Sequence, residues 1–242
     1  MGWTPRAACT LSMEIWTLYL GIYAEASSYI PSQSSSCQGP CIHAYRMFVL
    51  GSRTDGGAAT NSDLLNSSFF RFKIVMNPYA RAVAIYHDAM EFPSFYGITH
   101  RDYSFNEFLG YIANGGNFGQ LGLFHIESRA HADGRGHWDA ICQIEHIKPC
   151  LSYINQKQGT NFTLPPASSY AATEHHAVHQ HMTGDVANTK WSRLRQKSGT
   201  RLLLPTWEDY YAQGGETAGL VKQLGAHDFD ELNEFPYTTD SQ

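Results

Sequence analysis

The stretch from Phe72 to Tyr86 reads FKIVMNPYARAVAIY. The run that leads into it, Phe69 to Val75 (FFRFKIV), is rich in aromatic and β-branched residues and predicts a β-strand. Asn77-Pro78 is a turn signal, because proline fixes its own backbone and disfavours the α conformation in the residue before it. From about Tyr79 to Met90, apolar residues recur on one helical face. The stretch therefore predicts a strand, a tight turn and a helix.

A tight turn before a helix is a common phosphate site, because the free N–H groups and the dipole at the helix start attract an anion. A second candidate of this kind is Pro5 to Thr10 (PRAACT), which stands just before a predicted helix over Leu11 to Tyr23. Arg6 and the hydroxyl of Thr10 would complete a phosphate cradle there. Only Met1 to Thr4 precede this segment, so we expect the strand before it to be missing.

Pro5 to Thr10 resembles the PKxGCT or PKTGST loop of carbohydrate sulfotransferases that use 3′-phosphoadenosine 5′-phosphosulfate (PAPS). In that family the loop binds the 5′-phosphosulfate. Arg6 stands at the family's lysine, Ala8 at its glycine and Thr10 at its hydroxyl, and Cys9 matches the cysteine of the first form. The resemblance implies that these four residues bind PAPS, and that Arg6 is also catalytic because it stabilises charge on the bridging oxygen.

Phe72 to Tyr86 resembles the family's second phosphate segment, FxFVRNPYxRLVSAY, which binds the 3′-phosphate. The residues in register are Asn77, Pro78, Tyr79, Arg81, Val83 and Tyr86. Shorter matches follow in the family's order: YSFNEF at Tyr103 to Phe108, His137-Trp138, Pro149-Cys150, Tyr153 and the tail from Asp209 to Tyr237. The resemblance therefore spans nearly the whole chain and implies that Asn77, Arg81 and Ala84 belong to the nucleotide site.

Two positions depart from the family pattern. Met76 stands where the family has the arginine of VRNP, and Ala84 stands where it has the serine of LVSAY. Those two are the family's 3′-phosphate ligands, and a charge-assisted contact of this kind is worth about 1.5–3 kcal/mol. The absence of both ligands predicts a much lower affinity for the nucleotide. Arg71 and Lys73 are alternative cations, but strand alternation places both on the same face as Val75.

Sulfuryl transfer also needs a base that takes the proton from the acceptor hydroxyl while the sulfuryl group moves in line. His137 is the first candidate and His43 the second, since some members of the family use a histidine between the two phosphate loops. The alternative for His137 is a packing pair with Trp138.

The resemblance implies one α/β domain over residues 1–242. The polar, histidine-rich composition of about 155–190 predicts a long irregular excursion there. The expected architecture of the domain is a three-layer, P-loop-like fold, in which helices flank a short parallel sheet that carries both phosphate loops at its carboxyl edge. PAPS would be the co-substrate, no metal would be needed, and the partner would be a carbohydrate acceptor. By resemblance alone, the compartment would be the Golgi lumen or membrane.

Two other functions are left open by the sequence. Met76, Ala84 and the short N-terminus favour a catalytically inactive relative that acts as a glycan-binding or structural protein. The histidine-rich segment at 174–182 (EHHAVHQHM) would hold a metal if helical spacing put its imidazoles on one face; otherwise it is a solvated polar segment. The aromatic side chains of Trp207, Tyr210 and Tyr211 would either stack on a sugar or pack as a buried face.

Charge and cysteine content restrict these functions further. The formal net charge of −5 argues against a partner held by bulk positive charge, such as a nucleic acid. No apolar run approaches the ~20 residues of a membrane span, and we expect no signal peptide at the start. Among five cysteines, Cys37–Cys41 and Cys142–Cys150 are possible disulfides. The glycosylation sequons at Asn66 and Asn161 would be used only in a secreted protein.

Overall fold

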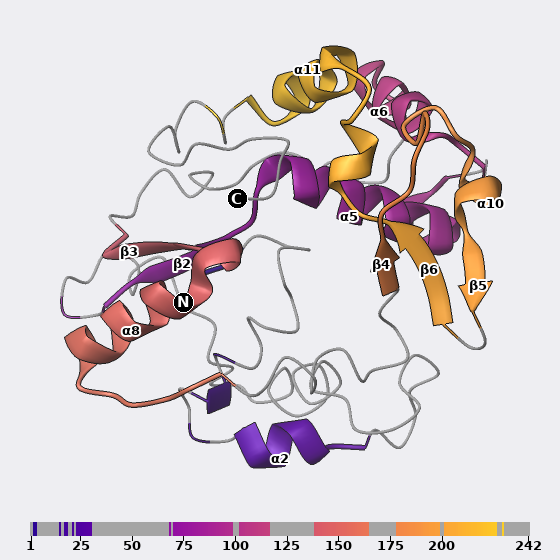
Figure 1. The fold of residues 1–242 in the computed structure, drawn as a ribbon. Helices are drawn as coiled ribbons and strands as arrows, with labels where there is room; N and C mark the ends of the chain where they lie inside the picture. The colour runs from indigo at the N-terminus through magenta and orange to yellow at the C-terminus, as the bar shows by residue number, and fades with distance from the viewer. Residues whose placement is uncertain are drawn as a thin grey trace. The chain divides into compact units, whose positions relative to one another are not determined.

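The chain forms two compact units of mixed helix and strand, each built on a short sheet with helices beside it (Figure 1). The first unit comprises Met1–Trp3, Ala7–Val75 and Arg135–Tyr170, and the second contains the rest. This computed structural model describes residues 2–3, 15, 17–18, 21, 23–30, 68, 70–98, 102–116, 138–164, 178–198, 201–226 and 229. The predicted class, short parallel sheets flanked by helices, is confirmed; the single-domain assignment stays a prediction.

The sheet of the first unit is wholly parallel, in the order β1-β2-β3. β1 is Gly2–Trp3, β2 is Phe72–Val75 and β3 is Ala140–Gln143. Phe72 and Ile74, which alternate along β2, are both buried. The start of β2 is tied to the turn before β3, because the backbone N–H of Arg71 donates to Asp139 Oδ2 at 2.7 Å.

β1 corrects one expectation from the sequence. A strand before Pro5 was expected to be missing, yet Gly2 and Trp3 pair with Lys73 and Ile74 of β2. Two residues are too few to carry a period-2 pattern, so the sequence itself held no strand signal. The pairing arises because the backbone N–H and C=O groups along the edge of β2 can bond to a segment that is distant in the sequence.

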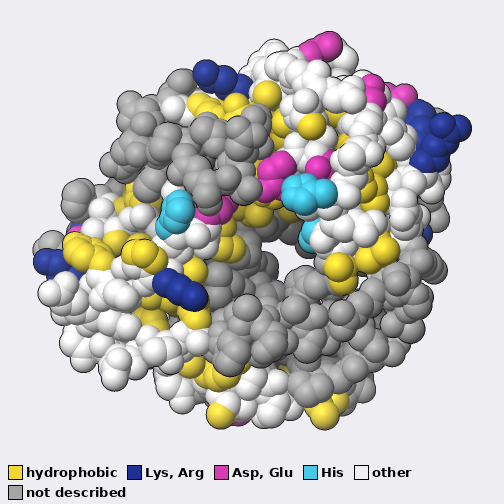
Figure 2. Space-filling view, viewed as in Figure 1, with side chains coloured by type: hydrophobic (Ala, Val, Ile, Leu, Met, Phe, Trp, Pro, Cys, Tyr) yellow, Lys and Arg dark blue, Asp and Glu magenta, His cyan; other side chains and the backbone are white. Residues whose placement is uncertain are grey.

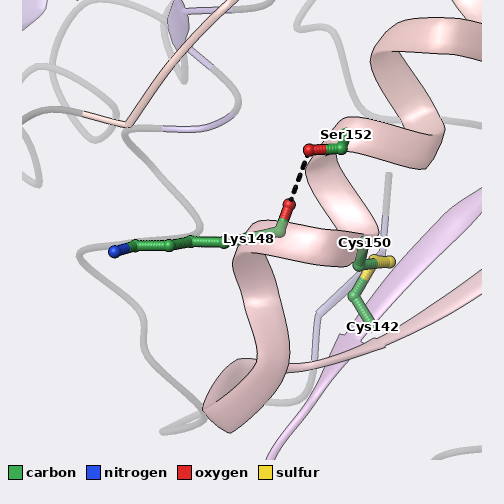
Figure 3. The surroundings of a disulfide bond; sticks show 4 residues. All are labelled: Cys142, Lys148, Cys150 and Ser152. Carbon is green, nitrogen blue, oxygen red and sulfur yellow. Dashed lines mark hydrogen bonds between the residues drawn. A yellow bond between two sulfur atoms is a disulfide. The ribbon is translucent and has the colours of Figure 1, made fainter.

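The helices of the first unit include α2 (Tyr23–Ser28) and α8 (Ile147–Gln158), the second preceded by the short turn η3 (Ile144–His146). Ile15 and Leu18, two described apolar residues of the predicted helix over 11–23, are helical, and Ile15 is fully buried. α8 packs its buried face, Leu151 and Ile154, against the sheet residues of the same core. A disulfide between Cys142 of β3 and Cys150 of α8 closes this contact and confirms one of the two predicted pairings (Figure 3).

Three helices of the second unit, α5 (Pro78–Glu91), α6 (Phe105–Ala113) and α11 (Gly215–Leu224), pack on one another. The short turn η2 (Pro93–Tyr96) follows α5. α5 and α6 agree with the sequence predictions, including the predicted start of α5 after Asn77. No described helix has the length and apolar character that crossing a bilayer requires.

The sheet of the second unit has the order β4-β6-β5, with β4 (Val178–Gln180) parallel and β5 (Gln196–Ser198) antiparallel to β6 (Arg201–Pro205). The short helices α10 (Trp191–Leu194) and η4 (Glu208–Tyr210) flank these strands in sequence. Within the excursion predicted at about 155–190, residues 155–158 complete α8 and residues 178–180 form β4. Both ends of that segment are therefore more regular than the sequence indicated.

The core of the second unit is built around the ring of Tyr86, which is fully buried in the middle of α5. The rings of Phe105, Phe108 and Trp191 lie with their centroids 5.4, 5.4 and 5.7 Å from it. Its hydroxyl donates a 2.7 Å hydrogen bond to the backbone carbonyl of Tyr103. Burial therefore raises the pKa of this phenol and keeps it a neutral donor.

Candidate functional site

The predicted 3′-phosphate segment adopts the strand, turn and helix expected of it. Asn77 is the N-cap of α5, and its Oδ1 accepts a 3.0 Å hydrogen bond from the backbone N–H of Tyr79. Pro78 occupies the first helical position, where the absence of an N–H is tolerated. The Tyr79 carbonyl accepts a 2.9 Å hydrogen bond from the Tyr211 hydroxyl, so the first turn is also fixed from outside the helix.

Arg81, the predicted basic residue of this turn, is buried, with only 3% of its surface exposed. It lies in a small recess lined otherwise by Gly225 and apolar side chains of α5, α6 and α11. A Cβ added at Gly225 would lie 3.9 Å from its guanidinium Nη2. The Arg81 side chain therefore lies beside the residue that ends α11.

The two departing positions lie next to this turn. Met76 and Ala84 are both half-buried, and neither side chain can donate a hydrogen bond. The alternative cation Arg71 is already engaged, because its Nε lies 3.3 Å from Asp139 Oδ2. The Nε of Arg71 is thus used by Asp139, and its role as a substitute phosphate ligand stays a prediction.

The other predicted site residues lie outside the described residues. These are the PAPS-loop residues Arg6, Ala8, Cys9 and Thr10 and the candidate bases His137 and His43. Their assignments remain predictions. The structure brings together, of the predicted set, Asn77 and Arg81 in the first turn of α5 and Ala84 one turn later.

A polar site that the sequence reading missed joins His181 to Asp209. His181 Nδ1 lies 3.2 Å from Asp209 Oδ1, while Asp209 Oδ2 accepts the backbone N–H groups of Met182 (2.9 Å) and Thr206 (3.0 Å). The carboxylate is buried and the imidazole is 81% exposed. Since the carboxylate can only accept, this contact places a proton on Nδ1, which also lies 3.3 Å from the Thr206 hydroxyl. Figure 2 shows histidine side chains at the surface beside acidic ones.

A local signal for half of this site was present in the sequence. Thr206-Trp-Glu-Asp209 matches the spacing of a helix-capping box, and Asp209 does bind back to the Thr206 N–H at the start of η4. The partner His181 comes from the end of β4, so its place beside Asp209 depended on β4 pairing with β6.

The helical metal site considered for the histidine-rich segment is not formed by its described part. His179 lies in strand β4, and its Nδ1–H donates to the carbonyl of Pro205 at 2.9 Å. Among the residues that the structure describes, no group of three or more potential ligands gathers to hold a metal ion. The physical reason is that β4 pairs with β6, and a strand does not give the i,i+4 spacing that such a site needs.

The aromatic residues considered for sugar stacking form part of the core. Tyr210 and Tyr211 are buried. The Tyr210 ring packs edge-on against the ring of Phe105, with the two ring centroids 5.1 Å apart. Trp207 is half-buried. The packing alternative is therefore confirmed for both tyrosines.

The resemblance to the sulfotransferases rests on the residues of the two phosphate-loop segments and on the order of the shorter matches. Of these two segments, the one from Phe72 to Tyr86 is described, and it has the strand-turn-helix form expected of it. In comparisons with known proteins, no family model, no curated protein and no solved structure matches the chain.

Proposed function

We propose that this chain transfers a sulfuryl group from PAPS to a carbohydrate hydroxyl, on a three-layer α/β fold of the P-loop type. The observation that carries the proposal is the parallel pairing of β1 with β2. Neighbouring parallel strands end at the same edge of a sheet, which is where such folds bind phosphates. In the sequence, Pro5 to Thr10 follows β1 and Asn77 to Arg81 follows β2, and in this proposal both segments begin at that edge.

In this proposal the first segment holds the reacting end of PAPS. Arg6 and Thr10, with the backbone of Ala8 and Cys9, bind the 5′-phosphosulfate. The bond between sulfur and the bridging oxygen breaks as a bond from sulfur to the sugar oxygen forms, and 3′-phosphoadenosine 5′-phosphate leaves. Arg6 stabilises the charge that grows on the bridging oxygen. His137 takes the proton from the sugar hydroxyl.

The second segment shapes the 3′-phosphate loop. The Asn77 cap supports this role, because its hydrogen bond to the Tyr79 N–H fixes the first turn of α5, in which Arg81 is buried. The Cys142–Cys150 disulfide supports an oxidising compartment such as the Golgi lumen, where disulfides persist.

An inactive relative that binds glycans or serves a structural role is the second candidate. It is favoured by the two positions that depart from the family pattern. Met76 directly precedes the Asn77 cap and Ala84 lies in α5, both half-buried, and neither side chain brings a charge or a hydroxyl to an anion there.

Calorimetry with 3′-phosphoadenosine 5′-phosphate separates these functions at the level of binding. The double variant Met76→Arg, Ala84→Ser restores a cation and a hydroxyl, so we expect it to bind the nucleotide more tightly than the wild type. The matched control is Gln223→Arg, which adds the same charge at an exposed position of α11. Equal affinity in the double variant and the control would mean that the phosphate is not held at this turn.

Transfer of labelled sulfate from PAPS to a panel of glycans tests the reaction itself. Because Arg6 acts on charge that develops in the transition state, Arg6→Ala should lower turnover roughly 10²–10³-fold and change nucleotide affinity less. Equal rates in wild type and Arg6→Ala would remove Arg6 from the mechanism. Nucleotide binding without transfer to any acceptor would favour the inactive relative.

A further inference from the structure

The segment that follows α8 presents two polar side chains on one side. Residues 160–164 alternate in burial: Phe162 and Leu164 pack against the core of the first unit, whereas Asn161 and Thr163 are exposed. Alternation of this kind places the side chains of residues i and i+2 on the same side of an extended chain. Asn161 and Thr163 therefore face solvent together.

Hydrogen bonds to Asn155 of α8 fix this presentation. The backbone N–H of Thr160 donates to the Asn155 carbonyl at 3.0 Å, and the Thr160 hydroxyl donates to Asn155 Oδ1 at 2.8 Å. The Asn155 Nδ2 donates in turn to the carbonyl of Phe162 at 2.8 Å. The residues on both sides of Asn161 are thus anchored to the helix, and the Asn161 amide stands between two fixed points.

Asn161-Phe162-Thr163 also has the spacing of an N-glycosylation acceptor, with no proline in the middle. A second, independent feature of the same unit is the Cys142–Cys150 disulfide, which joins β3 to the helix that anchors the segment. Structural disulfides form in the oxidising secretory compartments, where N-glycans are added to such acceptors. The sequon and the disulfide therefore point to the same environment.

We infer that Asn161 is the acceptor of an N-linked oligosaccharide, whether or not the chain transfers sulfuryl groups. The co-reactant is a lipid-diphosphate-linked oligosaccharide. Asn161 Nδ2 forms a C–N bond to the anomeric carbon of the first sugar while the C–O bond from that carbon to the diphosphate breaks. The amide nitrogen loses one proton, and the lipid diphosphate leaves with the bonding electron pair.

The test uses the whole chain, expressed behind a cleavable secretory leader in a eukaryotic cell. Treatment with peptide N-glycosidase should increase the gel mobility of the wild type, and peptide mass spectrometry should then find aspartate at position 161. Asn161→Gln and Thr163→Ala should each lose the glycan at this site, whereas Thr163→Ser should keep it. All three changes are at exposed positions, so the fold is expected to tolerate them.

The control Asn66→Gln removes the other sequon discussed above and should leave the Asn161 glycan in place. Thiol labelling before and after reduction reports whether Cys142 and Cys150 are joined in the same secreted protein. An unmodified Asn161 peptide in the secreted wild type, in either redox state of that pair, would overturn the inference.

Discussion

At the scale of single residues, His87 shows how burial changes the chemistry of a side chain. It lies in the middle of α5, and its Nε2 shares a 2.7 Å hydrogen bond with the buried Tyr210 hydroxyl. Its ring is stacked on that of His179, with centroids 5.8 Å apart. Burial, with a smaller contribution from the neighbouring His179, lowers the pKa of His87 to about 3. His87 is therefore neutral near pH 7.

This pKa has a consequence for stability. An unfolded histidine has a pKa of about 6.5, so the unfolded chain takes up the proton before the folded chain does as the pH falls. The contribution of His87 to the free energy of unfolding is fully present above about pH 6.5. It is lost progressively as the pH falls toward the folded pKa of about 3. In that window the free energy of unfolding should fall by about 1.4 kcal/mol per pH unit from this residue.

We predict that His87→Phe removes this part of the pH dependence, measured by urea unfolding between pH 7 and pH 4. At pH 7 the variant should be less stable by about 1–3 kcal/mol, because the Tyr210 hydroxyl loses its partner. His146→Phe, at an exposed histidine, is the control and should keep the wild-type pH dependence. The assignment would be wrong if His87→Phe and wild type lost stability in parallel as the pH falls.

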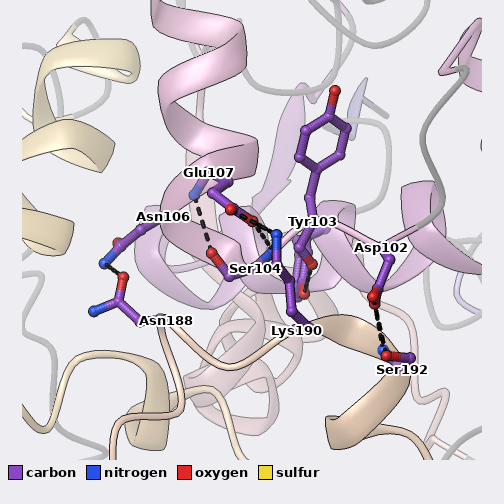
Figure 4. A network of polar contacts seen from close by, with 9 residues as sticks. Asp102, Tyr103, Ser104, Asn106, Glu107, Asn188, Lys190 and Ser192 are labelled. Atoms are coloured by element: carbon purple, nitrogen blue, oxygen red, sulfur yellow. Dashed lines mark hydrogen bonds and ion pairs between the residues drawn. The ribbon is translucent and has the colours of Figure 1, made fainter.

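At the scale of elements, the start of α6 is held by a capping box and by a distant segment (Figure 4). Glu107 Oε2 accepts the Ser104 N–H at 2.7 Å, and Ser104 Oγ accepts the Glu107 N–H at 3.3 Å. Lys190 Nζ donates to Glu107 Oε1 at 2.6 Å, and this hydrogen bond is the main cause of the lowered pKa of Glu107. The same carboxylate thus caps a helix and binds a cation from another segment.

Ser104→Ala should lower the free energy of unfolding by about 1 kcal/mol, because it removes the acceptor for one N–H at the helix start. Lys190→Met should cost less than about 1 kcal/mol, since both partners of that ion pair are nearly half exposed and water weakens their attraction. Urea unfolding at pH 7 measures both. A larger loss for Lys190→Met than for Ser104→Ala would show that the ion pair, not the cap, fixes the start of α6.

At the scale of the whole molecule, the two units have separate cores. One is centred on β2, β3 and α8, the other on the Tyr86 cluster, and their buried residues do not overlap. Stability in a protein is distributed over such units, which can open independently. The disulfide between Cys142 and Cys150 belongs wholly to the first unit.

We therefore predict a local effect of removing this disulfide with Cys142→Ala and Cys150→Ala. Closing a loop of eight residues in sequence restricts the unfolded chain enough to be worth about 2–3 kcal/mol. In hydrogen exchange, amides of β2, β3 and α8 should exchange faster, and those of α5, α6 and α11 should be unchanged. Wild type kept reduced serves as the control and should behave like the variant. Faster exchange throughout both units would contradict their independence.

The sequence by itself determined the elements whose signals are local. The aromatic and β-branched run before Asn77 gave β2, Asn77-Pro78 started α5, and Ser104 with Glu107 started α6. In each case the residues that cause the element lie within it or beside it, so their pattern is visible along the chain. The same local pattern predicted a phosphate site at the turn that begins with Asn77.

Tertiary structure alone decided the features that join distant segments. β1 exists because Gly2 and Trp3 pair with the edge of β2, and residues 178–180 of the histidine-rich segment form a strand because they pair with β6. His181 lies beside Asp209, and the pKa of His87 is lowered by burial, only after the chain has folded around these residues. Strand pairing and the burial of polar groups depend on which parts of the chain meet, and no short stretch of sequence contains that information.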